Sequence, residues 1–513
     1  MPQAIAAAGP RLLHSSMPTD AERAASLFTP YVVALCTLIV ACALLLFLKE
    51  RKNKCSITCG PTAGYDLRFL LPYGVCAAAD WLQGPYVYAL YDSYGYDHFT
   101  INALFVVGFT AAMVTGPIVG AVADRFGLRL MVVVGYCVTY ALACVTKHFS
   151  SLTWLYLGRL LGGTATSVLF SCFESWLVAE YTAGGQSGAT IGAALSRMYF
   201  INGMAGILMG PLAQVFVSAA PLTPLNPAVN MSDPSAISTS NSVFVGGDAT
   251  AFDLSFLFLS VGMCLVLVLW GEHRPYYTAA VAGEATSLSN AAAAEGFACL
   301  PAIKWLCTQP VGLLLMLGSA CTEAAMYSFV IEWTPALTTA NTTPPHGLVF
   351  AAFLTAYMIG ATLLPWLSSS DVQSDAALLA AIAGGVASVA MAVAAFFEGQ
   401  YMEGDAAPLH ATFAVFCAMC VFEGCLGAYF ALVGSVKASQ VPENMRATVY
   451  GTFRVPLNLL VVLIELFVTS SAMAFAVCTV LLLTGLVCFL FAYFGIRSQA
   501  QKGEAASEKT PLT

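Results

Sequence analysis

Three arginines lie in long apolar stretches of this chain, where a charged side chain is expensive. Arg159, Arg197 and Arg454 are the arginines that we expect well inside these stretches, and we expect no lysine there. A charge inside a membrane costs several kcal/mol unless it is paired or faces water, so each one marks a candidate functional position. The planar guanidinium offers a fork of N–H donors that suits an oxyanion. These arginines are therefore candidate functional residues.

Arg454 has the most informative neighbours of the three. Pro456 is expected to break the helix close by and to free a backbone carbonyl toward a cavity. Asn458 follows four residues after Arg454, so the two side chains share one helix face. The segment around Arg454 is therefore the best candidate for substrate contact in the second half of the chain.

Carboxylates also occur within apolar stretches, and a buried carboxyl group can carry a proton. Such a group could couple the movement of a solute to that of a proton. In the alternative reading the charges only tie helices together, with Arg197 paired to Glu174 and Arg454 paired to Glu423. The candidate carboxylates are Asp80, Glu174, Glu323, Glu423 and Glu465.

A polar stripe follows Asp80 at helical spacing. Gln83 lies on it, Tyr88 is adjacent, and both side chains could donate hydrogen bonds to oxyanion oxygens. Asp80 would repel an anion unless it is protonated or paired. The tyrosines could instead form an interfacial aromatic belt, as we expect for Tyr94 and Tyr96.

The elements that position these residues must be membrane helices. The chain is 59% hydrophobic and 9% charged over 513 residues, whereas soluble proteins carry roughly 25% charged residues. Apolar stretches of about 18 or more residues recur throughout, long enough to cross a bilayer. We expect thirteen spans, at residues 31–48, 67–91, 101–123, 128–147, 151–179, 188–216, 252–270, 302–331, 347–367, 376–397, 409–436, 446–469 and 472–495.

These spans predict an all-α membrane protein with one extra N-terminal helix followed by two six-helix bundles. An Ala/Gly/Ser-rich stretch separates the two sets of six. The expected divisions are an N-terminal tail with the extra helix and a basic linker (1–65), a first bundle (66–270), a central linker (271–301), a second bundle (302–496) and a tail (497–513).

Positive charges predict the orientation. A basic cluster at residues 49–54 follows the first span, whereas a signal peptide carries its charges before the apolar core. With this cluster in the cytoplasm, the N-terminus lies outside and the C-terminus inside. Of the lysines and arginines in connecting loops, only Lys147 then falls outside. The glycosylation sequons at Asn230 and Asn341 also fall outside, which favours the plasma membrane.

A polar loop between the second and third core spans resembles the signature of major facilitator transporters. Gly120 would let helices approach, Asp124 would accept from a helix N-terminus or pair with arginine, and Gly127 would turn the chain. With Arg125 and Arg129, such a cluster would hold the outward-facing state by polar contacts between helices and release these contacts when the protein opens inward. The alternative is a cytoplasmic loop that merely carries positive charges and a turn glycine.

Longer strings narrow the resemblance. Gly158-Arg159-Leu-Leu-Gly-Gly163 resembles the second motif of the same superfamily. Residues 66–495, apart from the loop at 217–251 and the central linker, look like the molybdate-anion transporter family. That resemblance implies uptake of molybdate, a tetrahedral dianion, by alternating access, and the three arginines would then be its donors. A membrane potential of 100 mV would oppose entry of a dianion by about 4.6 kcal/mol, so proton coupling would help a cell to import it. The strings that carry the resemblance are Asp80 to Tyr91, Thr146 to His148, Gly158 to Gly163, Phe173 to Glu180, Glu332 to Pro335 and Phe453 to Asn458.

Other classes of function find little support in the sequence. No Walker loop, metal-binding helix or nucleophile elbow is present, so we expect neither an enzyme nor an ATP-driven pump, and no cofactor. Cys55 and Cys59 lack the second pair that a zinc site needs, and no basic run suggests nucleic acid. The expected partners are an oxyanion, protons and the bilayer, with a monomeric chain. The open alternatives are the same fold carrying sulfate or another small solute, and a non-transporting receptor or sensor.

Overall fold

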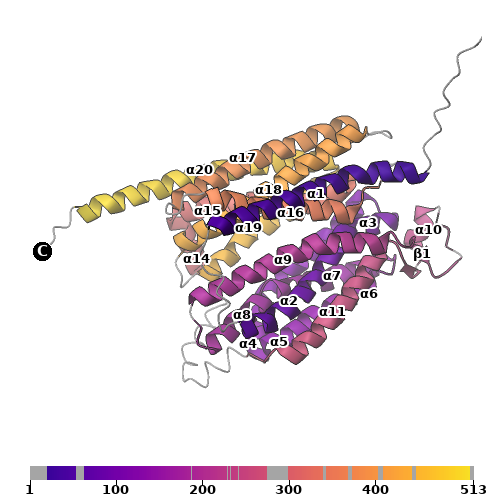
Figure 1. Ribbon diagram of the computed structural model, residues 1–513, viewed down its shortest axis with the longest axis horizontal. Helices are drawn as coiled ribbons and strands as arrows, with labels where there is room; N and C mark the ends of the chain where they lie inside the picture. Colours follow the sequence, from indigo (N-terminus) through magenta and orange to yellow (C-terminus); the bar gives the residue numbers. More distant parts are fainter. Residues whose placement is uncertain are drawn as a thin grey trace, which may run out of the picture.

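The computed structural model describes residues 20–52, 63–186, 188–227, 229–231, 233–240, 242–273, 299–338, 343–367, 373–402, 408–441 and 446–508. Cys55, Cys59, Asn341 and most of the central linker lie outside these residues. The described chain forms two six-helix bundles and one extra N-terminal helix, which confirms the predicted fold class (Figure 1).

The first bundle contains every span expected between residues 67 and 270, but two of them are interrupted. A 3₁₀-helix at Gly84–Tyr86 interrupts the span predicted at 67–91. We predicted a single span at 151–179, and the structure has two helices there, because the chain turns at Phe170 and Ser171. The elements are α2 (Ala63–Gln83), η1 (Gly84–Tyr86), α3 (Val87–Ser93), α4 (His98–Phe126), α5 (Leu128–Leu130), the π-helix η2 (Met131–Val138), α6 (Thr139–Thr146), α7 (Leu152–Leu169), α8 (Cys172–Ala183), α9 (Gly188–Val217) and α11 (Ala249–Leu269).

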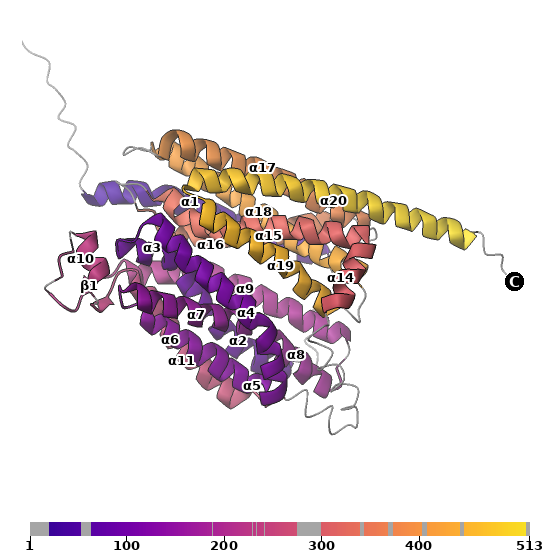
Figure 2. The ribbon, with the colours of Figure 1, turned by 180° about the vertical axis from the view of Figure 1, so that it is seen from behind.

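A small ordered cap follows α9. Strand β1 (Thr223–Pro224) pairs antiparallel with β2 (Phe244–Val245), and α10 (Pro234–Thr239) lies between them in the chain. We call this end of the bundles the sheet end. The opposite end, which carries residues 270–273 and α14 (Cys299–Thr308), is called the linker end (Figures 1 and 2).

The second bundle also follows the predicted spans, with one correction. We expected Pro456 to break its helix, but α19 continues through this residue. A proline removes one backbone N–H, and a helix packed on its neighbours can absorb that loss. The elements after α14 are α15 (Pro310–Leu337), α16 (His346–Leu367), α17 (Gln373–Phe397), the π-helix η4 (Glu398–Met402), α18 (Leu409–Gln440), α19 (Arg446–Phe467) and α20 (Ser471–Glu508).

The extra helix α1 (Asp20–Lys52) packs on the second bundle. Tyr31 and Leu35 are buried in the same apolar cluster as residues of α16 and α18. The ring of Tyr31 meets the ring of Phe416 edge to face, with 5.0 Å between centroids. Figure 1 shows α1 lying along α16, far in sequence but adjacent in space.

Ten helical spans of the described chain are long and apolar enough to cross a membrane by themselves. The other predicted crossings are less regular. One is interrupted by η1 between α2 and α3, another is split between α7 and α8, and α19 carries polar residues. Interruptions of this kind are tolerated in membrane proteins where neighbouring helices or a cavity satisfy the backbone.

The two bundles meet through α9 and α16. Gly347 of α16 donates its backbone N–H to Oε1 of Gln214 on α9, at 3.0 Å. A Cβ atom on Gly210 would collide with the carbonyl of Gly347, so these backbones touch. The ring of Trp81 lies 5.6 Å from that of Phe350. These contacts use the last part of α9 and the first part of α16, so they lie toward the sheet end.

Candidate functional site

Arg159 is held by close packing of α7 against α4. Its Nε donates to the carbonyl of Leu104, at 3.2 Å, and its guanidinium lies over the ring of Phe105, at 4.4 Å from the centroid. Gly163 packs directly on the backbone of Gly108. The glycines of this motif therefore permit helix contact, and that contact positions the arginine.

Lys147 is the functional candidate that the sequence prediction missed. We placed it in an outside loop and expected no lysine within the spans, but its side chain is only 3% exposed and points into the first bundle. It follows the last residue of α6, and its Nζ donates to the hydroxyl of Tyr91. Its carbonyl accepts from the hydroxyl of Tyr94, at 2.6 Å. Burial follows because the loop after α6 is covered by the β-strand cap, since Phe244 N donates to the carbonyl of His148.

Lys147 and Arg159 line the same pocket inside the first bundle. The pocket holds about 510 Å³ of space, counting the part that is open to solvent. Within the described parts of the chain, neither cation has a carboxylate in ion-pair range. The remaining lining residues are Gln83, Val87, Gly108, Phe109, Ala112, Tyr140, Ala143, Gly158, Gly162, Gly163 and Thr166.

Two polar side chains from the predicted stripe belong to this pocket or stand beside it. Gln83 is 4% exposed, lines the pocket, and donates through Nε2 to the hydroxyl of Ser255, at 2.8 Å. Asp80 accepts from the hydroxyl of Tyr140, at 2.7 Å, and Tyr140 is a lining residue. Asp80 is therefore linked to the pocket by the hydrogen bond that it accepts from Tyr140.

Phe109 connects the pocket to the second bundle. Its ring meets that of Tyr327 on α15, with 5.1 Å between centroids. Arg454 on α19 lies within electrostatic range of Tyr327 and is exposed, and Asn458 follows one turn later on α19. Arg454 thus stands across the bundle interface from the pocket and is not one of its lining residues.

The carboxylates predicted for coupling are spread over separate sites. Glu323 accepts from the hydroxyl of Tyr429, at 3.0 Å, and pairs with Nζ of Lys437, at 3.3 Å. Glu423 is 8% exposed, and no ion pair joins it to Arg454 in the described chain. The alternative pairing of these two residues is therefore not seen in the described chain.

Glu174 and Arg197 lie on the neighbouring helices α8 and α9. Glu174 accepts from the hydroxyl of Tyr199, at 3.0 Å. Arg197 is partly buried and makes interactions of its own. Tyr88 lies near the sheet end, where its ring stands 6.5 Å from that of His98. These three residues are therefore separate from the pocket that contains Arg159.

The predicted polar loop turns at Gly127, which has φ of +114°. Its neighbours in space come from the chain after α11. Arg129 N donates to Oε1 of Glu272, at 3.0 Å, and Leu128 N donates to the carbonyl of His273, at 2.9 Å. Gly120 and Asp124 lie on the last turns of α4, and Arg125 is exposed. The loop is therefore hydrogen-bonded to the start of the central linker, at Glu272 and His273.

The first glycosylation sequon is accessible. Asn230 is exposed and belongs to the segment between β1 and β2 at the sheet end. The second, at Asn341, lies outside the described residues.

Comparisons with known proteins agree with this architecture. The family model MFS_5, described as sugar transporters with 12 transmembrane segments, matches residues 30–237 and 235–418. The molybdate-anion transporter of Xenopus laevis is 27% identical over 456 residues, which cover 87% of this chain and 89% of that protein. The molybdate-anion transporter of Danio rerio is 27% identical over 408 residues, or 76% of each chain.

Solved structures show the same fold. A peptide-bound transporter of the POT family superimposes with a TM-score of 0.59 over 86% of this chain and 98% of that one, at 11% identity. Such low identity supports the fold alone. The family match covers well over half of the sequence and places the chain among transporters and not among enzymes. The chain therefore belongs to the MFS_5 family of major facilitator transporters, together with the molybdate-anion transporters that it resembles.

Proposed function

We propose that this chain is a secondary transporter of molybdate and that the anion binds in the pocket between Lys147 and Arg159. This proposal rests mainly on one observation: both cations line one pocket, and neither has a carboxylate partner in the described chain. Two positive charges match the two negative charges of the dianion. The names of the curated relatives support the choice of cargo.

The chemistry of the pocket suits a tetrahedral oxyanion. Arg159 can present two N–H groups in one plane, and Lys147 can add a compact point charge. Tyr140 and Gln83 supply neutral polar groups at the same wall. Two uncompensated cations in a protein interior cost several kcal/mol, and a bound dianion would offset that cost.

A neutral sugar is the cargo that the family description suggests, and the pocket argues against it. A sugar would leave both cations without a counter-charge, whereas an anion removes the penalty. Sulfate offers the same shape and charge as molybdate, so it is the nearest competing cargo. A receptor would bind the same anion without moving it.

Transport requires that the pocket opens alternately to the two membrane faces. The contact between Phe109 and Tyr327 lies where the two bundles meet, so rocking of the bundles would change access to the pocket. Arg454 and Asn458 would contact the anion from the second bundle in one of the two states. The polar loop from Gly120 to Arg129 would stabilise one state at the linker end.

The sheet end is proposed to face the cell exterior at the plasma membrane. The distribution of basic residues and the exposed sequon at Asn230 support this orientation. The N-terminus is then outside and the C-terminus cytoplasmic. The functional unit is one chain, divided into bundles at 66–270 and 302–496.

The test is uptake of radiolabelled molybdate at nanomolar concentration by cells that express the chain. Lys147→Gln and Arg159→Gln each remove one charge from the pocket. Each should lower uptake about 10- to 100-fold, because a hydrogen bond to a charged group contributes roughly 1.5–3 kcal/mol. Arg497→Gln is the matched control, since Arg497 is exposed near the end of α20 and donates to Tyr493, at 2.8 Å.

The outcomes separate the competing functions. Loss of molybdate uptake in the presence of excess sulfate would point to a general oxyanion carrier. Saturable binding of molybdate to the purified protein without uptake would support the receptor. If a correctly inserted chain neither binds nor moves any oxyanion, the pocket assignment and the proposed cargo both fail.

A further inference from the structure

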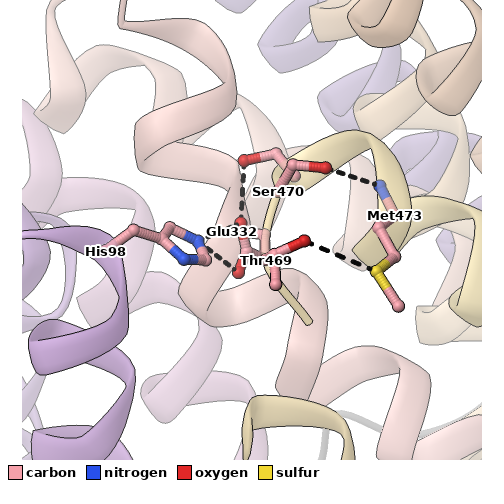
Figure 3. A network of polar contacts seen from close by, with 6 residues as sticks. His98, Glu332, Thr469, Ser470 and Met473 are labelled. Carbon is pink, nitrogen blue, oxygen red and sulfur yellow. Dashed lines mark hydrogen bonds and ion pairs between the residues drawn. The ribbon is translucent and has the colours of Figure 1, made fainter. Parts of the chain in front are cut away.

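A polar bridge joins the two bundles at the sheet end. His98 is the first residue of α4, and its Nε2 lies 2.9 Å from Oε1 and 3.1 Å from Oε2 of Glu332 on α15. Figure 3 shows the imidazole pointing at this carboxylate from the neighbouring bundle. Neither residue of the bridge lines the pocket that contains Arg159, and the bridge belongs to the surface that must separate when the sheet end opens.

Glu332 is completely buried, with 0% of the residue exposed. On its own side of the interface, Oε2 accepts from the hydroxyl of Ser471, at 2.7 Å. The start of α20 holds Ser471 in place, because the backbone N–H of Met473 donates to the hydroxyl of Ser470, at 3.3 Å. The second bundle therefore positions the carboxylate, and the first bundle supplies its cationic partner.

No other cation compensates this carboxylate. Among the described residues, His98 is the only cationic side chain in ion-pair range of Glu332. The remaining titratable groups that face the pair are Asp97 beside α4, Tyr88 of α3, Glu465 of α19 and Cys478 of α20. All of these are acids. The protonated imidazole is thus the group that makes a buried, ionised Glu332 tolerable.

Glu465 adds a constraint. It is 1% exposed, and neither of its carboxylate oxygens has a hydrogen-bond partner in the described structure. A second ionised carboxylate this close to Glu332 would be costly, so Glu465 holds its own proton when the sheet end is closed. Only one positive charge, on His98, is then available to balance the site.

We propose that closing the sheet end binds one proton at the His98–Glu332 pair, so that protons hold this end shut. In the closed state the pair is an imidazolium and a carboxylate in contact. When the end opens, the two groups separate into water, and the imidazole releases its proton to the medium. A separated histidine is mostly neutral above about pH 6.5, so closing takes up one proton in that range.

This inference rests on the alternating-access part of the proposed function and not on the identity of the cargo. Its test therefore uses no anion. Dyes are attached through unnatural amino acids at Thr153 and Gln400, which are exposed near the sheet end of α7 and in η4. Single-molecule energy transfer in nanodiscs then reports the separation of the bundles between about pH 5.5 and 8.5.

The closed-to-open ratio should fall as the pH rises, by up to about tenfold per pH unit, which is the limit for one linked proton. Glu332→Gln and His98→Gln should each remove this dependence. His98→Lys should restore a closed end across the same range, because lysine stays charged there. The lysine variant keeps the test decisive even if Glu332→Gln fails to fold.

His410→Gln is the matched control, since His410 is an exposed histidine at the start of α18 that makes no bridge to the first bundle in the described structure. It should keep the wild-type response. A distance distribution that ignores pH in the parent chain overturns the proposal. A pH response that survives in both His98→Gln and Glu332→Gln also overturns it. Either result leaves the molybdate proposal untouched, because uptake is measured separately.

Discussion

Gly108 lies so close to Arg159 that a Cβ atom on Gly108 would stand 2.7 Å from a terminal guanidinium nitrogen and 2.9 Å from Nε. The glycine on α4 thus leaves the space in which the arginine of α7 reaches the pocket. This relationship connects the packing of two helices to the position of a charge. A substitution at Gly108 can therefore displace the guanidinium of Arg159 while the helices still fold and insert.

The first prediction concerns Gly108→Ala. The added methyl group should displace the guanidinium and lower molybdate uptake about 10-fold or more, because charge-assisted hydrogen bonds depend steeply on geometry. The half-saturating concentration should rise while the amount of protein in the membrane stays unchanged. Uptake kinetics with quantified surface protein measure both.

Gly116→Ala is the matched control for Gly108→Ala. It lies on the same helix, and the nearest atom to its added Cβ would be the hydroxyl oxygen of Ser167, at 4.0 Å. Normal uptake by Gly108→Ala, at equal expression, would show that Arg159 does not bind the anion in the position seen here.

Much of the fold followed from the sequence, because crossing a bilayer demands long apolar helices with internally satisfied backbones. Every predicted span has a helical counterpart. The packing partner of α1 could not be predicted, since apolar helices of similar length look alike in sequence and only side-chain fit selects a neighbour. The break at Phe170 was missed for a related reason, as the hydropathy continues across it.

The site was harder to predict than the fold. Arg159 and Gln83 were identified because a polar residue inside an apolar stretch is conspicuous. Lys147 was placed in a loop, because it is the last residue of its apolar span and the cap that buries it comes from a segment far along the chain. One sequence signal did exist, since Lys147 was the single basic loop residue that contradicted the charge count. A basic residue that falls on the outer side of an otherwise consistent topology is therefore a candidate for a buried position inside the bundle.

The second prediction compares two adjacent glycines of α7. Gly163→Ala should destabilise the protein by about 1–3 kcal/mol, because the methyl group would overlap the carbonyl of Gly108 and stand 2.9 Å from Cβ of Ala111. Gly162→Ala should be neutral or stabilising, since its Cβ would find its nearest neighbour, a ring carbon of Tyr140, at 3.7 Å. Thermal unfolding of both variants in one detergent measures the difference. Equal melting temperatures would mean that α4 and α7 do not pack as described.

The third prediction concerns the turn at the linker end. Gly127→Ala should cost of order 1–3 kcal/mol for backbone strain at a φ of +114°. The methyl group would also stand 3.1 Å from Cγ of Glu272 and so push this carboxylate away from the N–H of Arg129. Gly185→Ala is the control for strain alone, because its φ is +68° and no atom lies within 4 Å of its Cβ.

The variant Gly127→Ala should therefore be less stable than Gly185→Ala. Adding Glu272→Ala to Gly127→Ala should cost less than Glu272→Ala costs in the parent, because the two changes remove the same contact. Unfolding measured on the parent, the two single variants and the double variant gives this coupling. Strict additivity would show that Gly127 and Glu272 act independently.

The fourth prediction concerns how pH affects the docking of the cap at the sheet end. His148 Nδ1 donates to the carbonyl of Phe244, at 2.8 Å, and Nε2 lies 3.0 Å from Oδ1 of Asp253. Both ring nitrogens face acceptors, so the geometry requires the imidazolium. The hydrogen bond that Nε2 donates to Asp253 raises the pKa of His148 above its usual value. The stabilisation is then fully present below about pH 6.5 and is lost as the pH rises through the folded-state pKa.

Limited proteolysis of the segment between β1 and β2 should therefore accelerate as the pH rises from about 6 to 9, after correction for the protease's own pH profile. His148→Gln should cleave at a pH-independent rate, because an amide can donate to Phe244 but does not titrate. Asp253→Asn should move the acceleration to lower pH, since it removes the group that holds the proton on His148. An unchanged midpoint in Asp253→Asn would mean that this carboxylate does not charge the histidine, and the cap would then be held by its backbone hydrogen bonds alone.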